Sequence, residues 1–176
     1  SYFKNGGKFL RPSVLLFSCG AVGGDEKTAL PAACGLEVYH TWTLVHDDIL
    51  DMDAKRRGGM SVHEEFRRKA KKEFSCRDNL ASHYGVSVGI LAGDIQHAWA
   101  ISLFSELSSK YGINEKLTLK LIAELETNVL SKLIEGELLD IQYAKRPLES
   151  LSETMITGML WKKTGALYAF AGRAGA

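Results

Sequence analysis

Cysteine and proline are scarce in this chain of 176 residues, with three of each. Cys19, Cys34 and Cys76 are widely spaced and form no CxxC pair, which argues against a disulfide framework or a structural zinc site and favours a reducing cytoplasm. So few prolines exclude collagen-like and proline-rich chains. Apolar runs are far shorter than the roughly 20 residues of a membrane-spanning helix.

An excess of charge of one sign is also missing. Lys and Arg number 22 against 21 Asp and Glu, for a net charge of +1. This balance gives no global electrostatic case for binding nucleic acid or an anionic membrane, so any anion must be bound locally. Hydrophobic residues at 45% and charged residues at 24% are ordinary for a globular protein. The length and the lack of repeats predict a single domain over residues 1–176.

Strand-like alternation is nearly absent, and apolar residues recur at helical spacing, which predicts an all-α fold. The first helix is expected to start after Pro12 and the second to span 28–53, with Pro31 in its first turn. Further helices are expected over 78–107, 114–144 and 151–172. The basic run 67–72 is interpreted as a solvated helix face or loop, and 66–82 as a loop insertion without catalytic role.

Three carboxylates, Asp47, Asp48 and Asp51, end the second predicted helix among apolar residues, where uncompensated charge is costly. Asp47 and Asp51 are four residues apart and share a helix face. Oxygen ligands at this density suit Mg²⁺, which takes one or two carboxylates together with phosphate oxygens and water. The alternative is a capping and salt-bridge cluster with Arg56 and Arg57.

Two further features point to diphosphate binding. Gly6-Gly7-Lys8 is followed closely by Arg11, so two cations lie near flexible backbone, as in a diphosphate clamp. His40 precedes Asp47 by two helical turns and shares its face. Taken singly, a Lys and an Arg near a helix start are usually surface cations, and a lone His on an apolar face is more often a core residue.

Together with Arg56-Arg57-Gly58, Leu91-Ala92-Gly93-Asp94 and Lys163-Thr164-Gly165, these motifs resemble the trans-isoprenyl diphosphate synthase, or polyprenyl synthetase, family over essentially the whole chain. The resemblance implies packed antiparallel helices around a deep central cavity, the isoprenoid synthase type I fold, and normally a homodimer. It also implies Mg²⁺-dependent head-to-tail condensation of isopentenyl diphosphate with an allylic diphosphate through a carbocation.

The resemblance assigns roles residue by residue. The carboxylates would hold Mg²⁺ against the allylic diphosphate, and Arg56 with Lys163 and Thr164 would bind that leaving group. The expected catalytic and metal residues are Asp47, Asp48 and Asp51, with Arg56 and Lys163 as catalytic cations. The expected isopentenyl diphosphate site comprises Lys8, Arg11, His40 and Arg57.

Product length in this family depends on the fourth and fifth residues before the aspartate motif, here Thr43 and Trp42. Because Trp42 is bulky, it is expected to block the cavity and limit the product to C15–C20. The alternative is that Trp42 packs against a neighbouring helix as ordinary core.

The chain departs from the family pattern at two places. The second aspartate-rich motif is absent from residues 1–176, so the chain is expected to be the N-terminal and central part of a synthase domain, truncated on its C-terminal side. Glu137 stands where Gln is usual in the Gly136–Asp140 motif. Two other functions stay open: a class I terpene cyclase, which would not need a second diphosphate site, and a non-catalytic partner subunit, which would have no reason to retain converging carboxylates.

Overall fold

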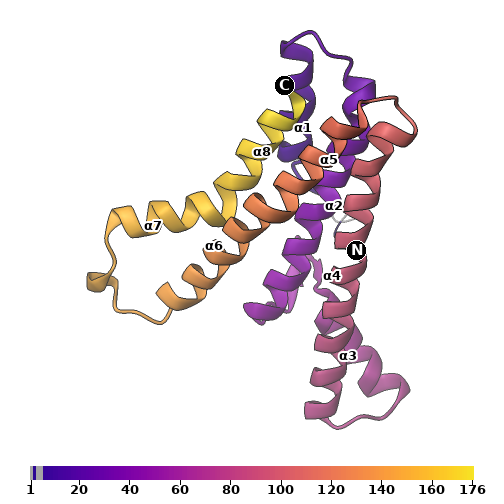
Figure 1. Cartoon of the computed structure of the whole chain (residues 1–176). Coiled ribbons are helices and arrows are strands. Elements are labelled where there is room, and N and C mark those ends of the chain that lie inside the picture. Colours follow the sequence, from indigo (N-terminus) through magenta and orange to yellow (C-terminus); the bar gives the residue numbers. More distant parts are fainter. Residues whose placement is uncertain (1, 3–5) are drawn as a thin grey trace. The chain divides into compact units, whose positions relative to one another are not determined.

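The computed structural model describes residue 2 and residues 6–176 of the chain. These residues are mainly helical, with one short hairpin, which confirms the predicted all-α class (Figure 1). Among them, no helix is both long and apolar enough to cross a membrane. The elements in chain order are α1 (Leu10–Ala21), α2 (Glu26–Leu50), β1 (Lys55–Arg56), β2 (Gly59–Met60), α3 (Val62–Glu73), α4 (Asp78–Ser109), α5 (Glu115–Glu124), η1 (Leu125–Val129), α6 (Leu130–Tyr143), η2 (Leu148–Ser150), α7 (Glu153–Leu160), η3 (Trp161–Gly165) and α8 (Ala166–Gly175).

The chain divides into two compact units, each described below by itself. Unit 1 comprises Ser1–Phe9 and Gly35–Ser102, and unit 2 comprises Leu10–Cys34 and Leu103–Ala176. Helices α2 and α4 each contribute residues to both units. Consequently the expected catalytic and binding residues fall into two groups, since Arg11, Lys163 and Thr164 belong to unit 2 and the others to unit 1.

Helix α2 begins two residues earlier than predicted because Asp25 caps it. The Asp25 carboxylate accepts hydrogen bonds from the Lys27 N–H at 3.0 Å and the Thr28 hydroxyl at 3.2 Å, which satisfies a donor that the helix start leaves unpaired. Pro31 therefore lies inside the helix rather than in its first turn, and the expected placement was wrong. The helix ends at Leu50, three residues before the predicted end.

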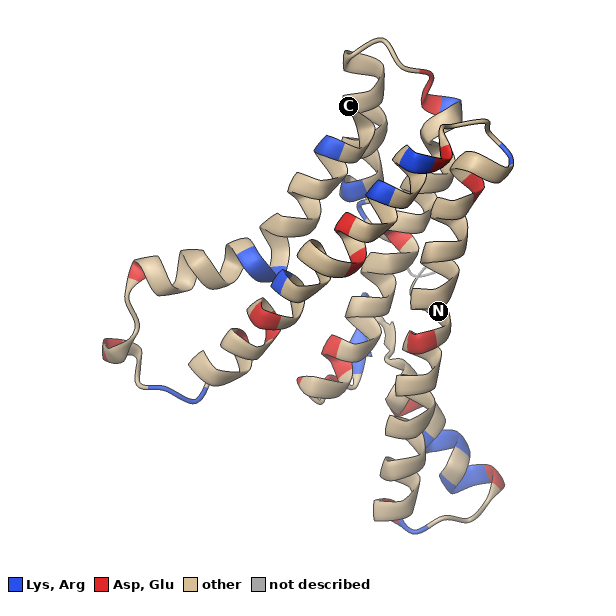
Figure 2. Ribbon diagram, in the orientation of Figure 1, with Lys and Arg blue, Asp and Glu red and all other residues tan. Residues whose placement is uncertain are grey.

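The predicted loop over 66–82 is wrong, because most of this segment is helical. Helix α3 runs to Glu73 and α4 begins at Asp78. Acidic residues in the first turn of α3 and lysines in its last turn complement the helix dipole. Glu64, only 6% exposed, accepts hydrogen bonds from Arg67 and Arg68 at 2.7 Å each. The basic residues seen along α3 in Figure 2 thus stabilise a helix as well as meeting solvent.

The core of unit 1 is an antiparallel pair formed by α2 and α4. The Tyr39 and Trp42 rings meet His97 at centroid distances of 5.5 and 4.6 Å. Further along α2, His46 lies 3.2 Å from the Ile90 carbonyl oxygen. As the contacts move forward along α2 from Tyr39 to His46, their partners move backward along α4 from His97 to Ile90, so the two helices are antiparallel.

Unit 2 is built from close helix contacts. Helix α1 packs along α8 and α6 packs against η3, and the Phe104 and Phe170 rings lie 6.0 Å apart. The helices predicted over 114–144 and 151–172 are each interrupted by one π-helical segment, η1 and η3 respectively. Such segments often occur at functional sites, and η3 contains the Lys163-Thr164-Gly165 motif. The largest fully buried apolar side chains of the unit are Leu15, Leu125, Leu167, Phe104 and Phe170.

Candidate active site

The aspartate motif lies where α2 ends. The Asp53 N–H donates to the Asp48 carbonyl at 2.8 Å and the Met52 N–H to the Ile49 carbonyl at 3.3 Å, with Met52 at a positive φ of 57°. This is the Schellman pattern, which turns the chain sharply out of the helix. Carboxylates at this end face the negative pole of the helix dipole, so they require a cation.

A two-stranded hairpin brings that cation back to the helix. Strands β1 and β2 pair antiparallel, with Lys55 opposite Met60 and Arg56 opposite Gly59. Arg57 and Gly58 form the turn, both at positive φ (50° and 77°), as a tight I′-type hairpin turn requires. The turn directs Arg56 toward α2.

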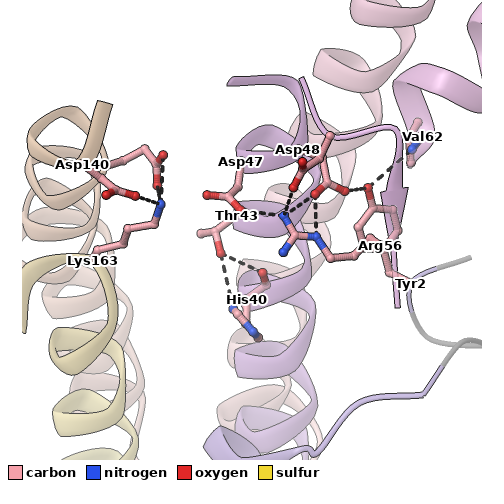
Figure 3. Close-up of polar contacts among 11 residues, drawn as sticks. Tyr2, His40, Thr43, Asp47, Asp48, Arg56, Val62, Asp140 and Lys163 are labelled. Atoms are coloured by element: carbon pink, nitrogen blue, oxygen red, sulfur yellow. Dashed lines mark hydrogen bonds and ion pairs between the residues drawn. The ribbon is translucent and has the colours of Figure 1, made fainter. Parts of the chain in front are cut away.

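Arg56 forms the centre of the cluster (Figure 3). Its Nε donates to Oδ1 of Asp48 at 2.5 Å, and its Nη2 donates to Oδ2 of Asp47 at 2.8 Å. Asp53 lies farther out, 3.7 Å from Nη2. Burial works against the charge of Arg56, but the hydrogen bonds and charges of Asp48 and Asp47 outweigh it and raise the pKa of Arg56. The salt-bridge cluster that the sequence offered as an alternative is therefore present.

The carboxylate of Asp48 is the most buried of the three, with no exposed surface. Its Oδ2 accepts a hydrogen bond from the Tyr2 hydroxyl, which in turn accepts the Val62 N–H at 3.4 Å. Burial, together with the hydrogen bond to Asp48, raises the pKa of Tyr2, so the phenol remains a donor. The sequence analysis missed Tyr2, since a single tyrosine before a glycine pair carries no pattern.

The carboxylates differ in what they offer a metal ion. Among the described residues, no group of three or more His, Cys, Asp or Glu side chains is arranged to hold one. The Asp51 N–H donates to the Asp47 carbonyl at 2.9 Å, so these two residues lie one helical turn apart on one face. Asp51 is exposed, and the Asp47 side chain is 14% exposed. Asp47 and Asp51 lie near the surface and fit Mg²⁺, although one Asp47 oxygen also accepts a hydrogen bond from Arg56. Asp48 differs because it is fully buried and both of its oxygens are bonded, one to Arg56 and one to Tyr2.

Arg57 connects the hairpin to the glycine loop. Its Nη1 donates to the Gly6 carbonyl at 2.8 Å. A Cβ placed on Gly7 would lie 2.6 Å from the same Nη1, so any other residue there would make the flexible guanidinium shift from this position. Lys8, the next residue, is exposed. The structure thus places Arg57 against the Gly6–Lys8 loop, and the role of Lys8 and Arg57 at isopentenyl diphosphate stays a prediction.

His40, Thr43 and Asp47 follow one another along one face of α2 (Figure 3). The Thr43 hydroxyl donates to the His40 carbonyl at 2.8 Å and lies 3.4 Å from its Nδ1. Trp42 points elsewhere, since its ring packs edge-on against Tyr39 at 4.9 Å and lies against His97 of α4. One side of Trp42 is thus packed against a neighbouring helix, and its role in product length stays a prediction.

The Leu91–Asp94 motif gains a physical explanation. A Cβ on Gly93 would lie 2.1 Å from Nε2 of His46, so only glycine lets the imidazole pack directly on α4. The same Nε2 contacts the Ile90 carbonyl at 3.2 Å and lies 4.0 Å from Asp94. His46 therefore fixes the last turns of α2 against α4, next to Asp47.

Lys163 anchors the polar cluster of unit 2. Its Nζ donates to Asp140 at 2.6 Å and lies 3.0 Å from Glu137. Gly136 allows this approach, because a Cβ there would lie 2.2 Å from the Lys163 backbone nitrogen. The Gly136–Asp140 and Lys163–Gly165 motifs thus form one contact between α6 and η3. In the same unit, Arg11 stacks on the Tyr168 ring at 4.5 Å, and Thr164 lies within η3.

The fold and these motifs define a class of all-helical proteins with an aspartate-rich motif, and comparison with known proteins identifies the family. The family model described as Polyprenyl synthetase matches residues 1–176, and the chain belongs to this family. The geranylgeranyl diphosphate synthase of Methanosarcina mazei is 33% identical over 171 residues, which are 97% of this chain and 45% of that protein.

Solved structures agree in fold. A geranylgeranyl pyrophosphate synthetase from Geoglobus acetivorans superposes with a TM-score of 0.81 at 32% identity, covering 99% of this chain and 49% of that one. A geranylgeranyl pyrophosphate synthase from Corynebacterium glutamicum, complexed with isoprenyl diphosphate and magnesium, gives 0.75 at 27% identity, covering 97% and 48%. The predicted family and fold are confirmed, and the chain spans about half the length of the relatives it matches.

Proposed function

We propose that the full-length protein is a trans-prenyltransferase that joins isopentenyl diphosphate head-to-tail to an allylic diphosphate and releases a C15–C20 prenyl diphosphate. The observation that carries the proposal is the arrangement of unit 1. Arg56 meets Asp47 and Asp48 at the end of α2, while the neighbouring Arg57 binds the loop of Gly6 and Lys8. The Arg56 cluster contains carboxylates, which suits a diphosphate bound through a metal ion. The Arg57 loop contains cations and backbone groups, which suits a diphosphate bound directly. The relatives named geranylgeranyl diphosphate synthase support this assignment.

The residue types fit the chemistry. Ionisation of an allylic diphosphate breaks a C–O bond and leaves negative charge on the departing pyrophosphate. Arg56 is positioned to stabilise that charge as it develops. The allylic cation must be kept from water, which an apolar helical cavity achieves. As the family resemblance implies, we assign acceptance of the final proton to the departing pyrophosphate.

We assign the metal to Mg²⁺, held by Asp47 and Asp51. Mg²⁺ characteristically takes one or two carboxylates together with substrate phosphate oxygens and water, and the related Corynebacterium structure contains magnesium with an isoprenyl diphosphate. When bound, the ion would polarise the phosphate oxygens and neutralise the leaving group. Asp48 contributes through Arg56 instead of through the metal.

The remaining site residues keep the roles that the family resemblance implies. We place Lys8, Arg11, His40 and Arg57 at isopentenyl diphosphate, and Lys163 and Thr164 at the allylic diphosphate. In support, Arg57 contacts the Lys8 loop. For the residues of unit 2 the support is the motif alone.

We also propose a cytoplasmic homodimer. All three cysteines are free thiols, which suits a reducing compartment. On α4 of unit 1, Leu91, Ile95 and Trp99 are spaced four residues apart and are 61%, 57% and 63% exposed. Such an apolar stripe suits burial against a second copy. Light scattering of the full-length protein should give twice the mass of one full-length chain, and the mass of a single chain would contradict the dimer.

The test is turnover of radiolabelled isopentenyl diphosphate by the full-length protein, whose intact mass is measured first against the 19.4 kDa of this chain. Asp47→Asn and Asp51→Asn should each reduce kcat by at least about a hundredfold while leaving the fold intact by circular dichroism. The exposed carboxylate of Glu149 supplies the control, and Glu149→Gln should leave turnover unchanged. Near-normal turnover of both aspartate variants would refute the metal assignment. Release of a hydrocarbon from a single prenyl diphosphate would indicate a cyclase instead.

A further inference from the structure

Tyr2 joins three segments of unit 1, although no motif includes it. The side chain is 8% exposed. Its hydroxyl donates to Oδ2 of Asp48 at the end of α2 and accepts the Val62 N–H from the first turn of α3 (Figure 3). That N–H is one of the amides that a helix start leaves without a partner inside the helix.

Asp48 depends on this contact because water cannot reach it. A buried carboxylate needs its charge compensated and its oxygens hydrogen-bonded. Arg56 supplies the charge and bonds Oδ1 at 2.5 Å through Nε. Tyr2 supplies the hydrogen bond to Oδ2. With both oxygens engaged, the carboxylate plane is fixed, and with it the Nε edge of Arg56.

We propose that Tyr2 is a positioning residue for the allylic diphosphate: acting through Asp48, its hydroxyl orients the Arg56 guanidinium that binds the leaving group. The inference rests on the function proposed above. Because Nε of Arg56 is bonded to Asp48 and Nη2 to Asp47, the guanidinium plane is fixed and its Nη1 donors are presented to a phosphate in one orientation. In the structure, Nη2 of this plane points toward Asp47, where the metal and the diphosphate would meet.

A merely structural role for Tyr2 makes a different prediction. Tyr2 also lies near the Gly6–Lys8 loop in sequence, so general loosening of the N-terminal segment would weaken both diphosphate sites. Loss of Arg56 orientation would weaken the allylic site alone. The two diphosphates therefore separate a positioning role from a structural one.

The experiment is calorimetric titration of the full-length protein, in the presence of Mg²⁺, with an unreactive allylic thiodiphosphate and separately with isopentenyl diphosphate. Tyr2→Phe retains the ring and removes only the hydroxyl. We expect its affinity for the thiodiphosphate to fall about tenfold, since a hydrogen bond to a charged group is lost, and its affinity for isopentenyl diphosphate to change less than about twofold. The matched control is Tyr111→Phe, since Tyr111 is 44% exposed in unit 2, and it should change neither.

A double-mutant cycle tests the route through Arg56. If Tyr2 acts by orienting Arg56, adding Tyr2→Phe to Arg56→Gln causes no further loss of thiodiphosphate affinity. Should Tyr2→Phe fail to fold, Asp48→Asn takes its place and should show the same selectivity. An equal loss of affinity for both ligands, or normal thiodiphosphate affinity of the variant, would overturn this inference but not the proposed function. Binding of neither ligand by the unaltered protein would refute the proposed function and the inference with it.

Discussion

Replacing Gly136 by alanine is expected to destabilise unit 2, although alanine is the better helix former. Gly136 is buried in α6, and a Cβ there would lie 2.2 Å from the Lys163 backbone nitrogen and 2.7 Å from the Lys162 carbonyl carbon. Ordinary contact begins near 3.4 Å, so α6 and η3 would have to separate by about 1.2 Å. Backbone atoms cannot rotate aside as a flexible side chain does, so the strain spreads along both helices.

The size of the effect follows from two opposing contributions. Alanine gains about 1 kcal/mol over glycine within a helix. Overpacking of a close contact costs about 1–3 kcal/mol, and separation of the helices also weakens the bond from Lys163 Nζ to Asp140 at 2.6 Å. We expect a net loss of about 1–2 kcal/mol, or about 3–6 °C in melting temperature for a chain of this size.

The matched control is Gly158→Ala in α7, because a Cβ on Gly158 would meet nothing within 4 Å. This variant should gain up to about 1 kcal/mol from helix propensity alone. Guanidinium unfolding followed by circular dichroism measures both. If Gly136→Ala matched or exceeded the unaltered protein while Gly158→Ala was stabilised, the inferred backbone contact between α6 and η3 would be refuted.

Two further predictions concern unit 1. The hydrogen bond from Arg67, helped by Arg68, lowers the pKa of Glu64 from 4.5 to about 2; this pairing therefore stabilises the fold above pH 4.5, and the stabilisation is lost as pH falls toward 2. Glu64→Gln should cost about 1–2 kcal/mol in urea unfolding at pH 7 and almost nothing at pH 2, and a difference independent of pH would contradict the ion pair. Trp42→Ala in the full-length protein should lengthen the product beyond C20, because it removes the bulkiest side chain beside the motif. Chromatography of the products measures their length, and an unchanged product would assign Trp42 to the core alone.

The sequence predicted well where one helix carries the whole pattern. Asp47 and Asp51 lie one turn apart on α2, as their spacing required, and α4 begins at the predicted Asp78. The prediction of a loop over 66–82 was wrong, because the charges of this segment were not recognised as pairing along a helix. The basic run 67–72 belongs to α3, in which arginines pair with the buried Glu64.

The amino-acid sequence by itself determined the helical class, the polyprenyl synthetase motifs and their order, because helical periodicity and short motifs are local properties of the chain. Only the tertiary structure distinguished Asp48 from Asp47. Adjacent aspartates look alike in sequence, but they point in different directions on a helix, and one of them is buried against Arg56 and Tyr2. Only the tertiary structure also explains the glycines at positions 93 and 136, where His46 and Lys163, residues far away in the sequence, pack too closely for a Cβ. Burial and packing depend on which segments meet in space, and that information is not carried by any local pattern.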